Sequence, residues 1–241
     1  MKKALIIFLC AGFVFFGTGC ASSGDVLLAQ KDPIALVSVV SNWDINWKGE
    51  ASLDPSINDI FVNRLLRRDP DLAYISNADE LINTAELLFR NTVAASSLIN
   101  LAEKDKVLLS GAYREAKTNR YQVNKGMTKP EGYRLVDYGD KNFHAAMAKE
   151  TGLQRSLFVE FDFTTEMVSG LGKNGNGRAN ADMKIIVLDS HGKTLYRKVF
   201  TAWSRTSTKV SSGVYSGSEL MNLFEEAIIE AVYDFLEKIS Y

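Results

Sequence analysis

Cys20 is the residue whose surroundings point most directly to a chemical modification. A short basic start is followed by an apolar stretch at residues 4–16 and by small residues at 17–19, directly before this cysteine. The apolar stretch is too short to span roughly 30 Å of hydrocarbon comfortably as a permanent helix. The pattern therefore predicts that residues 1–19 are a signal peptide that is removed, leaving a thiol suited to diacylglycerol transfer.

The residues around Cys20 resemble a bacterial lipobox with one departure, because Gly17 stands where leucine is usual. Each buried acyl methylene contributes about 0.8 kcal/mol, so several chains, palmitate among them, anchor a protein stably. We expect lipid on Cys20 to hold the chain to a bacterial envelope membrane, with residues 20–32 as a tether. Ala21 lacks the aspartate that commonly retains lipoproteins at the inner membrane, which favours the outer membrane. The alternative is an ordinary secretory signal in which the cysteine occurs by chance.

The composition argues against several classes of protein. Of the two cysteines, Cys10 lies within the predicted signal peptide, so the mature chain has one cysteine and no disulfide framework. The formal charge of the 241 residues is −1, and loss of Lys2 and Lys3 leaves about −3. Nucleic-acid binding needs a concentrated basic face, which this near-neutral chain gives no general reason to expect.

The two histidines, His144 and His191, do not indicate a metal or catalytic site. Neither has a cysteine or a second histidine at ligand spacing, so a zinc site would need unrelated carboxylates. A Ser-His-Asp triad assembles in space and not in sequence, but the Gly-x-Ser-x-Gly motif is missing and the serines at 211–212 suit a loop. We therefore expect no enzyme, no metal and no cofactor. A hydrolase with dispersed residues stays open as an alternative.

A glycine-rich segment at residues 170–177 superficially resembles a phosphate-binding loop. Such a loop needs Gly-Lys-Ser/Thr at the start of a helix, whereas Lys173 is followed by asparagine and then by a strand pattern. The glycines instead suit a loop at the tip of a β-hairpin, where they permit positive φ.

The elements that would position these residues follow from hydrophobic periodicity. The continuous apolar run at 34–40 predicts a strand that is buried on both faces. Alternation predicts further extended segments at 43–47, 132–137, 157–166, 183–187 and 194–205. The last three are joined by short connections, one of them a tight turn at 189–192, and therefore predict an antiparallel meander.

Helices are predicted where apolar residues repeat every three or four positions. These are residues 54–65, a helix capped within 77–80 and continuing to 93, a segment within 100–120, and a helix capped by Asp140 that buries Phe143, Ala146 and Met147 and ends near Gly152. A capping box at 216–219 opens a long amphipathic helix that continues to 239. The fold class is therefore α+β, with one sheet containing a meander and packed by helices. Residues 33–241 are expected to form a single domain.

Three tryptophans are candidates for a contact surface. Trp43 and Trp47 alternate with polar residues, and Trp203 ends the last strand of the meander. Each could cover a core edge or contact a partner, since indoles are common in both places.

The stretch from about Gly132 to Ile239 resembles a group of envelope lipoproteins that includes the curli-secretion protein CsgG, the penicillin-binding-protein activator LpoB and the TolB amino-terminal domain. The resemblance lies in the order of elements, with the opening strand at 34–40, an acidic turn at the end of 133–137, a helix reaching 150–152, a turn at 189–193, an aromatic strand at 199–203 and the final helix. It implies a mixed α/β sandwich that binds other proteins in the periplasm and catalyses nothing.

These features together predict a non-catalytic envelope lipoprotein that acts as a protein-interaction or assembly module. Its partners would be the membrane, through lipid on Cys20, and an unidentified envelope protein, and a homo-oligomer is also open. The alternative is an envelope lipoprotein that binds a small ligand, a glycan or a lipid, which predicts a concave aromatic pocket.

Replacement of Cys20 tests the predicted anchor. Cys20→Ser removes the thiol that would carry diacylglycerol, so the protein should lose palmitate label and leave the membrane fraction. Cys10→Ser is the matched control and should keep both. Labelling of the Cys20→Ser protein at the level of the control would contradict the prediction.

Overall fold

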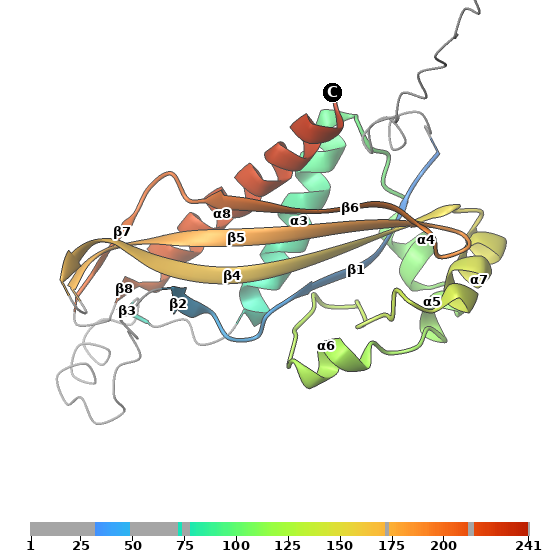
Figure 1. Cartoon of the computed structure of the whole chain (residues 1–241), viewed down its shortest axis with the longest axis horizontal. Coiled ribbons are helices and arrows are strands. Elements are labelled where there is room, and N and C mark those ends of the chain that lie inside the picture. The colour runs from blue at the N-terminus through green and yellow to red at the C-terminus, as the bar shows by residue number, and fades with distance from the viewer. Residues whose placement is uncertain (1–31, 49–71, 74–77, 172–173, 212–214, 241) are drawn as a thin grey trace, which may run out of the picture.

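A central mixed sheet of six strands organises the chain (Figure 1). The computed structural model describes residues 32–48, 72–73, 78–171, 174–211 and 215–240. The main path through the sheet runs β1-β4-β5-β6, in which β1 is Ala35–Ser41, β4 is Arg155–Leu171, β5 is Asn174–Asp189 and β6 is Thr194–Trp203. The predicted α+β class is confirmed.

Short strands extend or accompany this sheet. The strand β2 (Asn46–Lys48) continues beside β4 beyond the end of β1, and β7 (Thr208–Val210) pairs with the outer part of β5. Two further strands, β3 (Leu72–Ala73) and β8 (Tyr215–Ser216), form a separate antiparallel pair.

The strand β1 is buried along its whole length and pairs in parallel with β4. This confirms the strand predicted from the apolar run at 34–40. Burial on both faces explains why the sequence shows no alternation there, because neither face meets water.

The antiparallel meander β4-β5-β6 is also confirmed. The glycine-rich segment, however, is not the loop that we predicted, because pairing between β4 and β5 continues to Leu171 and Asn174. A Cβ on Gly175 would lie 1.9 Å from the Ser169 carbonyl oxygen, and one on Gly170 would lie 2.0 Å from the Asn174 carbonyl oxygen. The glycines therefore allow two backbones to approach closely within a ladder, and Gly170 also has a positive φ of 123°.

Two long helices cover one face of the sheet, as Figure 1 shows. They are α3 (Asp79–Ser96) and α8 (Gly217–Ile239), which pack against each other, with α8 over β5 and β6 and α3 beside β1. The predicted cap of α8 is confirmed, because Ser216 Oγ accepts a hydrogen bond from the Glu219 amide. The predicted cap within 77–80 is wrong, since α3 begins after Ala78, which has no side-chain acceptor to offer.

Four short helices form a second layer near one end of the opposite face (Figure 1). They are α4 (Lys104–Leu108), α5 (Gly111–Arg114), α6 (Arg120–Asn124) and α7 (Lys141–Thr151), so the helical prediction for 100–120 is confirmed in short pieces. The helix α7 begins at Asp140 and ends at Gly152, as predicted. It buries His144 with Phe143 and Met147, whereas Ala146 is exposed.

Residues 132–137 do not form the predicted strand. Tyr133 and Val136 are buried in two different apolar clusters, and the backbone between them makes only one bridge, from Val136 to Thr118. The Arg134 guanidinium donates to the carbonyl oxygens of Arg114 and Ala116, which holds the segment against a loop and not against the sheet. Alternating apolar residues indicate which side chains are buried, but not that the backbone forms a strand. Here the alternating side chains are buried by a loop that crosses between two apolar clusters.

The predicted helix at 54–65 and the predicted signal peptide at 1–19 lie outside the described residues, as does nearly all of the 20–32 tether. The single-domain assignment of 33–241 stays a prediction. Among the helices that the structure describes, none combines the length and the apolar character needed to cross a bilayer.

The aromatic contacts of Phe235 predict a large loss of stability when its ring is removed. The ring of Phe235 lies 5.6 Å from that of Phe200 and 6.5 Å from that of Phe89, measured between centroids. We expect Phe235→Ala to lower the free energy of unfolding by about 3–5 kcal/mol, because a cavity opens between α8 and its neighbours. Tyr233→Ala, on the exposed side of the same helix, should cost less than about 0.5 kcal/mol in chemical denaturation. Similar losses in the two variants would contradict this packing.

Candidate functional site

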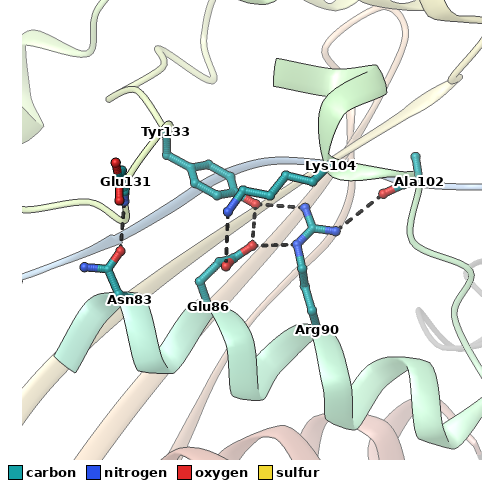
Figure 2. A network of polar contacts seen from close by, with 7 residues as sticks. All are labelled: Asn83, Glu86, Arg90, Ala102, Lys104, Glu131 and Tyr133. Carbon is teal, nitrogen blue, oxygen red and sulfur yellow. Dashed lines mark hydrogen bonds and ion pairs between the residues drawn. The ribbon is translucent and has the colours of Figure 1, made fainter. Parts of the chain in front are cut away.

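The densest polar cluster lies between α3 and the loop that precedes α7 (Figure 2). Glu86 Oε1 accepts hydrogen bonds from Arg90 Nε at 2.6 Å and from the Tyr133 hydroxyl at 2.9 Å. The Tyr133 oxygen in turn accepts from Arg90 Nη2 at 2.8 Å, which closes a ring of three hydrogen bonds. Lys104 adds its ammonium 3.4 Å from Glu86 Oε2 and 4.9 Å from the centre of the Tyr133 ring.

Two members of this cluster, Tyr133 and Arg90, have pKa values raised by their surroundings. Burial raises the pKa of Tyr133 well above its ordinary value, although the neighbouring Arg90 opposes the shift. Burial alone would lower the pKa of Arg90, but Tyr133 and Glu86 outweigh it and raise that pKa. Tyr133 therefore stays a neutral donor and Arg90 a cation near neutral pH, and each already has partners. The cluster holds three segments of the chain together.

The same face of α3 binds the loop at two further points. Asp79 Oδ1 accepts from the Thr128 hydroxyl at 2.5 Å, and Asn83 Oδ1 accepts from the Glu131 amide at 2.9 Å (Figure 2 shows the second contact). The helical positions 79, 83, 86 and 90 repeat every three or four residues and lie beside the buried apolar stripe. This polar stripe was the signal that our sequence analysis missed.

The histidines are placed without a metal-binding group around them. His144 is buried, with Nε2 2.9 Å from the Tyr138 carbonyl oxygen and Nδ1 3.3 Å from Ser156 Oγ, and it packs against aromatic rings. His191 is exposed in the turn between β5 and β6. Across the described ranges, no group of three or more His, Cys, Asp or Glu side chains could hold a metal ion.

Glu150 makes a separate polar contact at the edge of the helical layer. Its carboxylate accepts from the amides of Gly111 at 2.6 Å and Ala112 at 2.7 Å, at the start of α5. These two hydrogen bonds, the Ala112 amide foremost, lower the pKa of Glu150. The carboxylate thereby ties α7 to α5.

Trp43 is the candidate contact residue that the structure places most openly, with 43% of its surface exposed. It does not continue a strand as predicted, because the backbone bends at 42–45 before β2 begins. Asn42 causes the bend: its side chain donates to the Phe163 carbonyl at 2.9 Å and accepts from the Phe163 amide at 2.8 Å, in place of a backbone pair. The Trp43 carbonyl also accepts from the Ala78 amide at 2.9 Å, so the exposed indole projects from a fixed backbone.

Trp203 is half-buried at the end of β6. The Arg178 guanidinium lies over its ring, 4.2 Å from the centroid, and Arg178 Nη2 lies 3.3 Å from Glu166 Oε2. The three side chains form a row across β6, β5 and β4 on the sheet face opposite α3 and α8.

The three tryptophans do not form one patch along the sheet. Trp47 lies in β2, opposite Thr165 of β4, and its side chain is outside what the structure describes. Strands β2 and β6 lie at opposite edges, with β4 and β5 between them, so Trp203 is separated from the Trp43 and Trp47 segment. Cys20 also lies outside the described residues, and its predicted lipidation stays a prediction.

Two surface hollows contain an exposed tyrosine. One, of about 550 Å³, lies between the carboxyl ends of α3 and α8 and includes Leu98, Tyr233 and Leu236 in its wall. The other, of about 620 Å³, lies at the start of α6 and is lined by Lys117, Thr118, Asn119, Arg120, Tyr121 and Asp137. Both are open depressions of a size that could hold a small ligand.

The Glu86 cluster predicts a strong effect of removing one charge. Glu86→Gln would leave Arg90 and Lys104 without their counter-charge, so we expect the free energy of unfolding to fall by about 2–3 kcal/mol, after allowance for the partly exposed Lys104. Glu80→Gln, at an exposed position of the same helix, should change it by less than about 0.5 kcal/mol. Chemical denaturation measures both, and equal effects would show that the cluster does not hold the loop.

Comparison with known proteins gives a weak structural likeness only. No protein-family model matches this chain, and no curated protein matches it significantly in sequence. The LpoB C-terminal domain from Salmonella enterica aligns over 75% of this chain and 90% of its own, with a TM-score of 0.31 and 10% identity. The hypothetical protein CT253 from Chlamydia trachomatis aligns over 84% and 96%, with a TM-score of 0.33 and 11% identity. The first is a member of the group that the order of elements resembles, but TM-scores and identities this low do not establish kinship.

Proposed function

We propose that this chain is a non-catalytic envelope lipoprotein that presents its α+β domain to the periplasm as a protein-interaction module. Lipid on Cys20 would anchor it, with the outer membrane favoured by Ala21. The observation that carries the proposal is Trp43, a large indole held in the open by a backbone that is fixed on both sides. Exposed, rigid aromatic side chains of this kind dominate binding energy at protein interfaces because they bury much surface at little entropic cost.

The polar clusters support a binding role over a catalytic one. Glu86, Tyr133, Arg90 and Glu150 all contact other parts of the same chain. General acid-base catalysis needs such groups within reach of a substrate proton. Here their hydrogen bonds join helices and loops of the same chain.

A second candidate is binding of a small anionic glycan in the hollow beside α6. Tyr121 supplies an exposed ring on which a sugar can stack, and Lys117 and Arg120 supply positive charge next to it. Lys117 already lies 3.3 Å from Asp140 Oδ2, which reduces the charge available to a ligand. We therefore rank it behind protein binding.

Alanine at Trp43 tests the proposed interaction. The full-length lipidated protein is cross-linked in its native envelope, and the captured proteins are quantified by mass spectrometry. Trp43→Ala should reduce the main captured partner by about tenfold or more, as expected for the loss of an interface anchor. Trp203→Phe keeps a ring beneath Arg178 and tests the second indole.

The control is Leu87→Ala, which removes an exposed apolar side chain of α3 and should leave capture unchanged. Thermal denaturation must first show that each variant is folded. Unchanged capture by folded Trp43→Ala and Trp203→Phe would overturn the proposed contact surface. Capture of no protein by the wild type would favour the glycan candidate.

A further inference from the structure

The outer edge of β6 is unpaired within the described part of the chain. This strand ends the path β1-β4-β5-β6 and pairs with β5 alone. The opposite edge, in contrast, is covered, because β1 and its flanks bond to loops through Ile34 with Asn100 and through Ser41 with Thr128. A free edge of this length is a template for another extended segment.

The direction of the free backbone groups follows from one hydrogen bond. The Ser204 amide donates to the Ala179 carbonyl at 2.8 Å, so the backbone groups of residue 204 point toward β5. In an antiparallel pair these groups alternate between the partner and the opposite side. Since Ala202, Phe200 and Lys198 follow the same register as Ser204, the amides and carbonyls of Arg197, Val199 and Thr201 point outward.

The side chains along this edge are basic. Residues 193–205 include Lys193, Arg197, Lys198 and Arg205 and no aspartate or glutamate, although the chain as a whole has a charge of −1. Arg205 is neutralised by Glu230 at 2.5 Å. Arg197 and Lys198 are both exposed, on opposite faces of the strand, and have no ion pair among the residues that the structure describes. Lys198 Nζ lies 5.3 Å from the centre of the Phe200 ring. Val199, which follows Arg197 and Lys198 in β6, is 53% exposed and offers an apolar contact.

This charge pattern opposes pairing with a second copy of the chain. Antiparallel pairing of two β6 edges centred on Lys198 would place the Lys198 side chains of the two copies opposite one another, and like charges directly across a ladder are destabilising. Edge lysines and arginines commonly protect sheets against such association. The same cations stabilise a strand that brings carboxylates to these positions.

We propose that the β6 edge binds an extended acidic segment of another protein by β-strand addition. The segment would bond to the outward backbone of Arg197, Val199 and Thr201, place carboxylates near Arg197 and Lys198, and lay an apolar side chain against Val199. The inference rests on the proposed interaction function and names a second surface and the chemistry of its partner.

Two synthetic peptides test the edge directly on the full chain. One repeats Glu-Glu-Val-Val over about ten residues, near the upper limit of ordinary strand length, so that it can present a carboxylate on each face, and the other repeats Lys-Lys-Val-Val over the same length. Hydrogen exchange should show that the acidic peptide protects the outward amides of Arg197, Val199 and Thr201, and that added salt weakens this protection. The basic peptide should protect none of them. Equal protection by both peptides, or by neither, would overturn the proposal.

Two variants separate backbone pairing from charge. Val199→Pro removes an outward amide and leaves the β5 ladder intact, which edge strands tolerate, so it should abolish protection. The combined change Arg197→Glu and Lys198→Glu should weaken the acidic peptide by about tenfold or more and favour the basic one. Lys106→Glu with Lys149→Glu, on α4 and α7, is the matched control and should leave binding unchanged. Unaltered binding in the charge-reversed variant would overturn the assignment even if the proline variant does not fold.

The outcomes distinguish this inference from the proposed function. Capture that depends on Trp43, together with no peptide protection at β6, would refute the edge site and leave the interaction function standing. Protection of β6 by the acidic peptide, with no envelope protein captured, would support the edge site and refute the proposed contact surface at Trp43. Self-association of the wild type that Val199→Pro abolishes would assign the edge to a second copy and overturn the acidic partner.

Discussion

The parallel pairing of β1 with β4 constrains the remainder of the architecture. Parallel neighbours cannot be joined by a hairpin, so the chain must leave the end of β1 and return to the start of β4. The described helices α3 to α7 lie on that return path, α3 on one face and α4 to α7 near one end of the other. Because β1 is then covered on both faces, it carries no side chain to water, and its partner β4 is free to begin the meander.

Ion pairs and hydrogen bonds attach the loop at 128–133 to α3, because the apolar side chains of α3 are already packed elsewhere. The α3 helix uses its apolar stripe against α8 and the sheet, and only its polar stripe is left for the loop at 128–133. A buried carboxylate is costly unless cations and hydroxyl groups surround it, and Arg90, Lys104 and Tyr133 surround Glu86 in this way. The cluster therefore specifies which loop conformation packs here, a role that a purely apolar contact would fill less selectively.

Regular periodicity explains which elements the sequence predicted. The meander, α7 and α8 each combine a repeat of their own with a turn or cap, and such local signals suffice. Residues 132–137 and 43–47 have the same alternation, yet the first crosses a loop and Asn42 bends the second away from β1. Both outcomes depend on partners distant in the sequence.

The glycines at 170 and 175 led to the wrong prediction of a loop. Glycine is required both where two backbones approach closely within a ladder and where a loop needs positive φ, so the residue type alone does not distinguish the two. Of the candidate surface, the sequence left open whether Trp43 covers a core edge or faces solvent, and the position of Trp203 at the opposite edge required the strand order.

The entrance to β1 has a mechanical consequence. At this point the Arg155 guanidinium donates to the Asp32 carbonyl, and Ile34 bonds through its amide and carbonyl to the segment at 100–102. Tension applied from the amino-terminal side would act along β1, parallel to β4, and would strain the hydrogen bonds of the ladder together and not one after another. Bonds sheared together resist a greater force than bonds peeled singly. A protein tethered by its beginning would thus keep its sheet under a pull that would unzip a hairpin.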